Sequence, residues 1–346
     1  MKNRYILLLI SSVLFSLCSC DKEDDMREES VVVVETSNQN ELDVWIYENL
    51  TAPYNVEVKY KWDDSEIDNA YTVVPPKVEK AKEFLEAYLN VWIKTYEAEA
   101  NAGGDPEFLH KYMPKLLVLV GCPQYNEDGT MLLGLAEGGR KVTIFDIDNF
   151  NEPYLTGWET EEEIQLIKKR AVISAFHTLH HEFAHIMHQT KFYPDEFKEI
   201  CRGDYTGNWY EVYETEARTK GFITPYSMLN ENEDFVEIVA GMLTRAAYCN
   251  EPKLYTDLQL KDESGVLTAE LGDVYLNDWE ELLYLWAVEF DWDTYLLYQT
   301  PEALVGYDKF EQKIDIVTTY YKEKWHIDLY SLQKRIETAV DELFID

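Results

Sequence analysis

The chain has 346 residues, of which 46% are apolar and 14% aromatic, so it can bury a large core. Its formal net charge of −35 argues against nucleic acid as a partner, because binding to phosphates depends on Lys and Arg. An acidic surface suits an extracellular protein that must stay soluble, and it favours basic or neutral substrates near a cleft.

The first residues have the pattern of a secretory signal. Basic residues at positions 2 and 4 precede an apolar stretch over 5–17, which is too short to span a membrane as a mature helix. The segment Leu17-Cys18-Ser19-Cys20 is similar to a lipobox. Cys20 is the predicted lipidated residue, and Cys18 is the weaker candidate because a bulky Leu would stand just before the cleavage point.

An acidic tether follows the lipobox. Residues 21–25 are similar to the acidic signal that exports lipoproteins to the cell surface, and a solvated, disordered tether is the simpler alternative. We expect a lipoprotein signal peptide over 1–19, a lipidated tether over 20–40 and one domain over 41–346. The sequence holds no second long apolar run, so lipid would be the only anchor to the outer membrane.

The body of the chain is predicted to be an α+β domain with a small N-terminal mixed sheet. Residues 42–62 are expected to form a helical segment followed by an extended one, and a long helix is expected over about 76–101. Short apolar runs near glycines predict strands at Leu116–Gly121, Met131–Leu135 and Val142–Asp146. We expect the last strand to be the sheet edge that can pair with an extended substrate.

The next element is one helix over Glu161–His188, which carries five of the seven histidines. Residues four apart share a helix face, so His181 and His185 can offer two imidazole nitrogens to one ion. Glu182 is then directed toward a water whose pKa the metal lowers, as a general base requires. The spacing predicts a zinc hydrolase, against the alternative of partly buried histidines that only make hydrogen bonds.

The third zinc ligand is not expected on this helix. A metzincin would have Gly and His where this chain has His188 and Lys191. His188 lies about 10.5 Å along the axis from His181, too far for nitrogens that share one ion. The remaining common option is a glutamate on a second helix.

Such a helix is predicted over 230–243. Glu233 and Glu237 lie one turn apart, so one face can present Glu233 to zinc and Glu237 to the far nitrogen of a ligand His. Apolar neighbours on this helix imply that it packs inward, where unpaired carboxylates are costly. For Glu231 and Asp234 we expect instead the solvated first turn that the helix dipole favours.

The C-terminal half is expected to be mainly helical and to form the lower wall of the cleft. Its predicted helices are Trp279–Phe290, 307–324 and 328–344. Three cysteines, Cys122, Cys201 and Cys249, are too few for a disulfide framework, so the fold must rest on its core. One bridge among them is left open.

The segment that leads into the second helix resembles a known half-site. Gly221–Ser227, followed by Glu233–Glu237, looks like the second half-site of gluzincins related to the anthrax lethal-factor protease domain and the Pro-Pro endopeptidases. In those enzymes a Tyr seven residues before the ligand Glu supports the tetrahedral intermediate, and Tyr226 stands seven residues before Glu233. Packing is the alternative for one of 25 tyrosines. The resemblance implies zinc ligation by His181, His185 and Glu233, base catalysis by Glu182, oxyanion support by Tyr226 and ligand orientation by Glu237.

A closer resemblance covers nearly the whole chain. Leu42–Leu50, Pro53–Trp62, the His-rich helix and Tyr320–Leu329 are similar to the putative zinc-binding metallopeptidase lipoproteins of Bacteroidetes, also called substrate import-associated zinc metallohydrolase lipoproteins. This resemblance implies zinc as cofactor, a peptide or protein substrate, and association with an outer-membrane nutrient import complex. Ser227 and Val236 stand where that family usually has Ala, small changes that leave the ligands in place.

The remaining histidines of the stretch lie close to the predicted ligands. His177 and His188 share the stripe of His181 and His185 on a helix with about 100° per residue. We expect His177 to line the cleft above the zinc and His188 to pack below it. A second metal is the alternative, but no Cys or second acidic cluster stands nearby in sequence.

Two function classes fit the sequence. The first is a surface zinc endopeptidase or related amide hydrolase, and the second is a zinc-holding binding accessory of the import complex with little turnover. Glu182 discriminates between them, because a binding module has no need of a base beside a ligand pair. A non-peptide zinc hydrolase is a third interpretation, since one fold hosts several chemistries.

Overall fold

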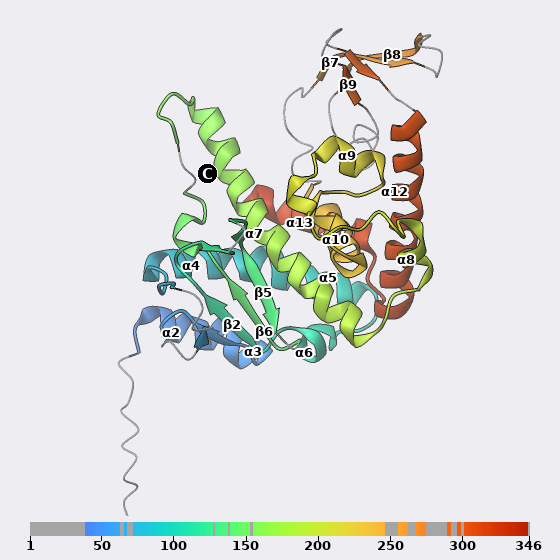
Figure 1. Ribbon diagram of the computed structural model, residues 1–346. Coiled ribbons are helices and arrows are strands. Elements are labelled where there is room, and N and C mark those ends of the chain that lie inside the picture. Colours follow the sequence, from blue (N-terminus) through green and yellow to red (C-terminus); the bar gives the residue numbers. More distant parts are fainter. Residues whose placement is uncertain are drawn as a thin grey trace, which may run out of the picture. The chain divides into compact units, whose positions relative to one another are not determined.

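The structure is a computed structural model, and Figure 1 shows its helices and strands. Leu42–Asp346 form one compact unit. The expected signal peptide and nearly all of the tether, with Cys20, lie outside the described residues. The residues that the structure describes are 39–62, 66–67, 72–126, 129–137, 139–152, 155–245, 255–261, 267–274, 289–291, 296–298 and 301–344.

A small mixed sheet has four strands in the order β1-β2-β6-β5. β1 (Glu57–Lys59), β2 (Leu116–Leu119) and β6 (Lys141–Ile144) are parallel neighbours, and β5 (Gly134–Glu137) pairs antiparallel with β6. The interior strand β2 reads Leu-Leu-Val-Leu, a continuous apolar run typical of a strand covered on both faces. This sheet confirms the predicted α+β class.

The predicted sheet edge is wrong. The strand expected at Val142–Asp146 is β6, which lies between β2 and β5. The edges are β1 and β5, and β5 pairs with β6 on the side of β6 that faces away from β2. Strand order depends on how the chain folds back, which the local apolar pattern does not encode.

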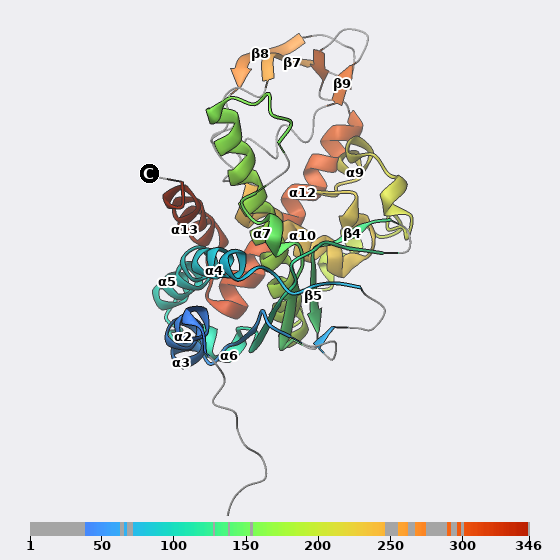
Figure 2. The same ribbon diagram turned by 90° about the vertical axis from the view of Figure 1, so that its left-hand side faces the viewer.

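Two long helical segments cross beside the sheet (Figure 2). The first runs from α4 (Val78–Ala87) through the π-helical turn η3 (Tyr88–Ile93) into α5 (Lys94–Ala102), close to the predicted 76–101. The second is α7 (Glu161–Thr190), which starts in a capping box of Thr160 and Glu163. Buried aromatic rings join the two segments: the ring centroids of Trp92 and Phe183 are 4.9 Å apart.

The C-terminal half packs around α10 (Glu231–Arg245), which contacts α7, α12 (Pro301–Tyr320) and α13 (Leu329–Glu342). The side chain of Asn230 accepts hydrogen bonds from the backbone N–H of Asn232 and Glu233, and so caps α10. These helices match the predicted 307–324 and 328–344. The predicted helix Trp279–Phe290 lies outside the described residues except at its end, where Glu289 and Phe290 belong to a strand.

The remaining elements are short. They are α2 (Glu41–Ile46), η1 (Tyr47–Thr51), α3 (Ala52–Tyr54), α6 (Phe108–Tyr112), β3 (Gln124–Tyr125), β4 (Met131–Leu132), η4 (Ile147–Asn149), α8 (Glu196–Ile200), η5 (Trp209–Glu211), α9 (Glu214–Thr219), η6 (Tyr226–Met228), β7 (Tyr255–Lys261), β8 (Leu267–Val274), β9 (Glu289–Asp291), β10 (Leu296–Tyr298) and η8 (Tyr321–Trp325).

A buried ion pair joins α10 to α12. Asp234 and Lys313 have fully buried side chains, and the Lys313 Nζ lies 2.6 Å from an Asp234 carboxylate oxygen. The hydroxyl of Tyr205 donates a further hydrogen bond to the same carboxylate at 3.0 Å. The prediction that Asp234 belongs to a solvated first turn is therefore wrong, because its partner comes from a helix 79 residues further along the chain.

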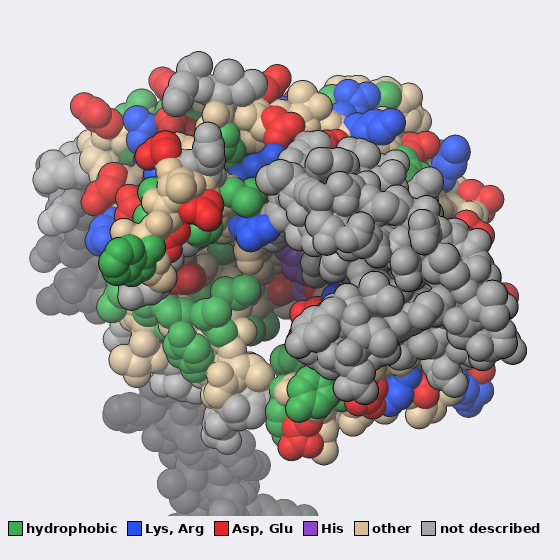
Figure 3. Space-filling model, turned by 90° about the horizontal axis from the view of Figure 1, so that it is seen from above, with side chains coloured by type: hydrophobic (Ala, Val, Ile, Leu, Met, Phe, Trp, Pro, Cys, Tyr) green, Lys and Arg blue, Asp and Glu red, His purple; other side chains and the backbone are tan. Residues whose placement is uncertain are grey.

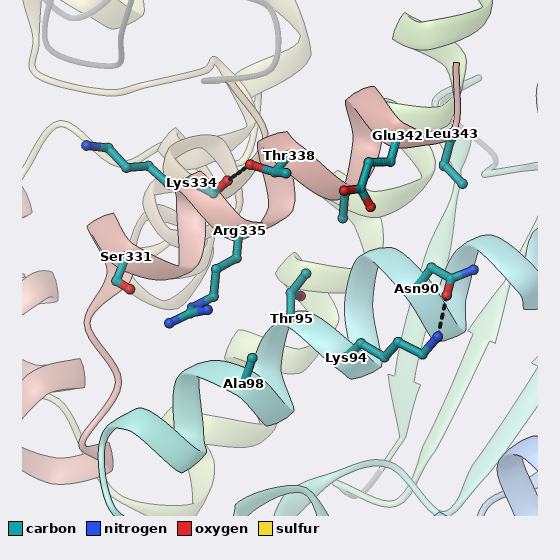
Figure 4. Close-up of a pocket in the computed structure, with 11 residues that line it drawn as sticks. Asn90, Lys94, Thr95, Ala98, Ser331, Lys334, Arg335, Thr338, Glu342 and Leu343 are labelled. Carbon is teal, nitrogen blue, oxygen red and sulfur yellow. Dashed lines mark hydrogen bonds between the residues drawn. The ribbon is translucent and has the colours of Figure 1, made fainter. Parts of the chain in front are cut away.

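A second buried carboxylate, Glu99, ties α5 to α13. It accepts hydrogen bonds from the Ser331 hydroxyl at 2.6 Å and from the Arg335 guanidinium at 2.9 Å. Figure 4 shows the two helices side by side, with Arg335 and Lys94 among the side chains along the groove between them.

Neither a membrane helix nor a disulfide is found in the part of the chain that the structure describes. None of its described helices is both long and apolar enough to cross a membrane. Cys122 and Cys201 are free thiols, and Cys249 lies outside the described residues. The buried apolar and aromatic side chains therefore carry the stability of this part, as the cysteine count predicts.

Candidate metal centre

The two histidines of the predicted ligand pair lie one turn apart on α7 and face α10. The His181 side chain is 9% exposed and that of His185 15%, and their ring centroids lie 4.9 Å apart. The spacing of four residues brings both rings to one face, as predicted from the sequence.

Glu233, in the first turn of α10, completes a set of three ligand atoms. Its Oε2 lies 3.1 Å from the Nε2 of His181 and 3.2 Å from the Nε2 of His185. Ligand atoms about 2.0–2.1 Å from a tetrahedral zinc lie about 3.3 Å from one another, so these separations match one shared ion. Two imidazole nitrogens and a carboxylate oxygen are also a donor set that zinc takes in hydrolases.

The charges around the three ligand atoms fit a cation as well. Burial opposes a charge on His181, but Glu233 and Glu237 outweigh it and raise the pKa of His181 to about 10. Burial likewise opposes a charge on Glu233, yet the hydrogen bonds of His181 and His185 lower the pKa of Glu233 to about 2. The buried carboxylates therefore require a positive partner, which a metal ion supplies in place of an imidazole proton.

Glu237, one turn after Glu233, holds the other nitrogen of His181. Its Oε1 lies 2.8 Å from the Nδ1 of His181 and 3.0 Å from the Nε2 of His177, and its Oε2 accepts a hydrogen bond from Thr224 at 2.9 Å. A carboxylate on Nδ1 leaves the Nε2 of His181 directed at Glu233. This is the arrangement predicted for Glu237 from its spacing.

His177, His181 and Glu237 form a second group in which three ligand atoms lie close together. This group shares His181 with the first group but uses its Nδ1. The Oε1 of Glu237 is already the acceptor for both histidines, which accounts for the short distances without an ion. Its geometry thus fits a hydrogen-bonded support for the first group. His177 also lines the cleft, as expected.

His188 has a contact that the sequence did not indicate. Its Nε2 lies 3.1 Å from the Nδ1 of His185, and its ring packs against Tyr193 and Phe235. Burial lowers the pKa of His188 to about 4, so it is neutral near pH 7 and its Nε2 can accept a hydrogen bond from the Nδ1–H of His185. Packing below the site was expected, but the support of a ligand was not. The sequence feature that could have indicated this contact is the three-residue spacing between His185 and His188.

Glu182 is buried beside the ligand set, 8% exposed, and its burial raises its pKa. The backbone N–H of Ala136 in the edge strand β5 hydrogen-bonds its carboxylate. A Cβ placed on Gly134 would lie 2.4 Å from Thr178 and 3.2 Å from Glu182, so only glycine lets β5 come this close to α7. The edge strand therefore shapes the surroundings of the candidate base.

Tyr226 lies in η6, just before α10, and faces the same site. Its hydroxyl hydrogen-bonds Glu233, and its ring centroid is 5.8 Å from that of His181. Burial, followed by the nearby carboxylates, raises its pKa, so its hydroxyl keeps its proton and can donate. Trp209 packs edge-on against this ring at 4.9 Å, a neighbour that the sequence did not indicate.

A cavity of about 210 Å³ opens onto these residues. Its polar floor comes from His181, Glu182 and Tyr226, and its apolar walls from Trp209 and the β4 segment. Figure 3 shows a hollow in which histidine and acidic side chains are visible, beside a field of hydrophobic side chains. A substrate group can therefore reach the candidate base and the ligand set from one side.

Comparisons with known proteins identify a family whose description names zinc binding. Residues 35–330 match a family described as putative zinc-binding metallo-peptidase. A crystal structure of a putative zinc-binding metallo-peptidase from Bacteroides caccae ATCC 43185 is 27% identical, with a TM-score of 0.56, over 87% of this chain and 92% of that one. A search of curated proteins found no match.

Proposed function

We propose, from the premise that the chain belongs to the family of putative zinc-binding metallo-peptidases, that it is a zinc endopeptidase of the gluzincin type. The observation that carries this proposal is the separation of 3.1 and 3.2 Å between Glu233 Oε2 and the Nε2 atoms of His181 and His185, with buried Glu182 beside them. These three side chains would hold one zinc ion. When bound, the ion supplies the Lewis acidity that makes water nucleophilic near neutral pH and polarises a carbonyl.

Glu182 would act as the general base. Its burial and raised pKa favour a carboxylate that takes a proton from water and can return it to a leaving amine. The hydrogen bond from Ala136 holds the carboxylate next to the edge strand, where an extended peptide could pair. A protein that only holds zinc has no use for such a group, so Glu182 supports turnover rather than binding alone.

Tyr226 would stabilise the charge that develops on the carbonyl oxygen of the substrate. Its protonated hydroxyl lies at the ligand set and borders the cleft. A donor that acts mainly in the transition state contributes to kcat more than to KM. Tyr226→Phe should thus lower kcat with little change in zinc affinity.

We also propose that the enzyme is a lipoprotein attached through Cys20 to the outer membrane, exposed at the cell surface and associated with a nutrient import complex. The support is the sequence pattern of the signal, lipobox and acidic tether, together with the resemblance to import-associated lipoproteins. Metabolic labelling with a fatty-acid probe should mark the wild type and not Cys20→Ala.

The test of the enzymatic proposal is a peptide-library digest with the protein lacking residues 1–20, with and without chelator. Cleavage should require zinc, and Glu182→Gln should keep zinc while turnover falls by about 10² or more, because Gln cannot take the proton. His185→Ala should lose zinc, since two remaining side chains hold it poorly. Equal cleavage by wild type and Glu182→Gln would place the base elsewhere. Zinc binding without cleavage of any peptide would favour the binding accessory.

A further inference from the structure

A second cavity, of about 640 Å³, lies against the N-terminal half of α7. Four small side chains at helical spacing form its α7 wall, namely Ala171, Ser174, Ala175 and Thr178. Apolar side chains from β6 and η4 line the opposite wall, including Ile144, Phe145, Ile147 and Phe150. The lining is thus mainly apolar, and the small residues of α7 leave room for a group from outside.

This cavity adjoins the cleft at the candidate metal centre. Met131, Leu133 and Thr178 line both cavities, so the two meet at the segment that joins β4 to β5. The α7 face that carries Ser174 and Thr178 is also the face that presents Glu182 further along, since the spacing is four residues at each step. We call these two adjoining cavities, which follow one another along α7, the trough.

The charged groups on the trough select against acidic substrates. Asp146 and Glu152 line the second cavity, and among the described residues neither cavity is lined by Lys or Arg. Glu152 is paired with Lys80 at 2.8 Å, and Asp146 accepts a hydrogen bond from Asn149. Because Lys80 compensates the charge of Glu152, Asp146 is the acidic group that remains beside the apolar lining, which suits an apolar side chain and disfavours a carboxylate.

We infer that this second cavity is the subsite for a bulky apolar side chain of an extended peptide substrate. Ser174 lies eight residues before Glu182, about 12 Å along the helix axis. An extended peptide covers that distance in about four residues, so the apolar side chain stands roughly three to five residues from the scissile bond. This inference rests on the proposed endopeptidase activity and adds its substrate class.

Ser174→Trp fills the subsite and tests this inference, because Ser174 is exposed in the cavity wall. Gln165→Trp is the matched control: Gln165 is exposed, lies nine residues earlier on α7 and so points to the opposite face. The probe is a library of peptides of about ten residues, long enough to span the trough when extended. Zinc content and thermal unfolding of both variants verify that each is folded.

Wild type should prefer peptides with a bulky apolar residue three to five positions from the cleaved bond. Ser174→Trp should lower kcat/KM for those peptides by at least about ten-fold, and less for peptides too short to reach the cavity, while Gln165→Trp leaves both values unchanged. An equal kcat/KM of Ser174→Trp and wild type on the long apolar peptides would overturn the subsite.

A binding measurement separates this inference from the proposed function. Glu182→Gln protein should enrich apolar peptides from the same library. The double variant that also carries Ser174→Trp should show no such enrichment. If wild type cleaves no peptide but the enrichment and its loss are seen, the enzymatic proposal fails and the subsite stands. If Ser174→Trp does not change the enrichment, the subsite fails whatever the activity.

Discussion

The two sides of α10 bury carboxylates in different ways. On the side toward α12, Asp234 meets the ammonium of Lys313 at 2.6 Å, with both side chains fully buried. On the side toward α7, the groups that can carry a positive charge beside Glu233 and Glu237 are imidazoles, at 2.8 to 3.2 Å. The first pair carries its cation in the chain at all times, whereas the second needs protonated histidines or an ion from solution.

This difference distinguishes a structural from a functional buried charge. A carboxylate removed from water must be compensated, and the chain supplies Lys313 where the charge only joins two helices. Where the compensating group is a histidine, it can be exchanged for a metal. Glu233 and Asp234 are adjacent in one helix turn, yet Asp234 joins two helices and Glu233 belongs to the candidate metal centre.

Loss of the internal cation should have the largest effect. Lys313→Met leaves Asp234 buried without a positive partner, and the free energy of unfolding should fall by about 3–5 kcal/mol. Zinc should not change this loss. Urea unfolding with zinc and with chelator measures both. Lys309→Met is the matched control, because its pair with Asp204 is partly exposed and should contribute less than about 1 kcal/mol. An equal loss in the two variants would contradict the comparison.

Removal of the zinc ion should have the second largest effect on stability. At free zinc about 100 times its dissociation constant, wild type should gain about 2.7 kcal/mol of unfolding free energy over the chelated protein. His185→Ala should gain little, because the set of three ligand atoms is broken. Calorimetric melting over a zinc titration measures the gain. A similar gain in His185→Ala would show that the stabilising ion lies at another place.

Glu237 should contribute to zinc affinity rather than to the fold. Glu237→Ala frees the Nδ1 of His181, and zinc affinity should weaken by about 10- to 100-fold, with activity restored by excess zinc. Competition with a zinc-sensitive dye measures the affinity. Thr224→Ala removes only one hydrogen bond to Glu237, so its effect should be smaller. Unchanged affinity in Glu237→Ala would exclude its role in orienting His181.

His188 should have the smallest effect of the four. His188 offers the Nδ1 of His185 a neutral acceptor, whereas Glu237 offers the Nδ1 of His181 a carboxylate. His188→Ala should therefore weaken zinc affinity by about ten-fold, the lower end of the effects expected for groups that orient a ligand. His188→Gln keeps an acceptor and should recover most of the affinity. If both variants bind zinc equally, then packing alone explains the position of His188.

The helices and most of the candidate site could be predicted from local patterns. The histidine spacing on α7 and the glutamate spacing on α10 each lie within one turn, and residues one turn apart share a face in any helix. The two helices then had only to pack against each other for these side chains to meet, as they do at His181 and Glu237.

Contacts between distant segments could not be predicted in this way. Asp234 resembles its neighbours in the first turn of α10, and only the packing of α12 distinguishes it. The order of strands depends on which strand pairs with β2, and the parallel pairing of β6 with β2 leaves β5 at the edge. The acceptor role of His188 depends on how its ring is oriented between Tyr193 and Phe235, a property of the packed interior.

The close approach of β5 to α7 limits how this protein can diversify. A methyl group at Gly134 would collide with Thr178 and crowd Glu182, so no single substitution can bring a side chain to this point without disturbing the candidate base. In the proposed enzyme, variation in substrate selectivity would therefore enter elsewhere in the trough, as at Met131 or Ser174, where the lining is exposed. If the proposed activity holds, an inhibitor that pairs with the backbone of β5 next to Gly134 would contact a segment that few substitutions can alter.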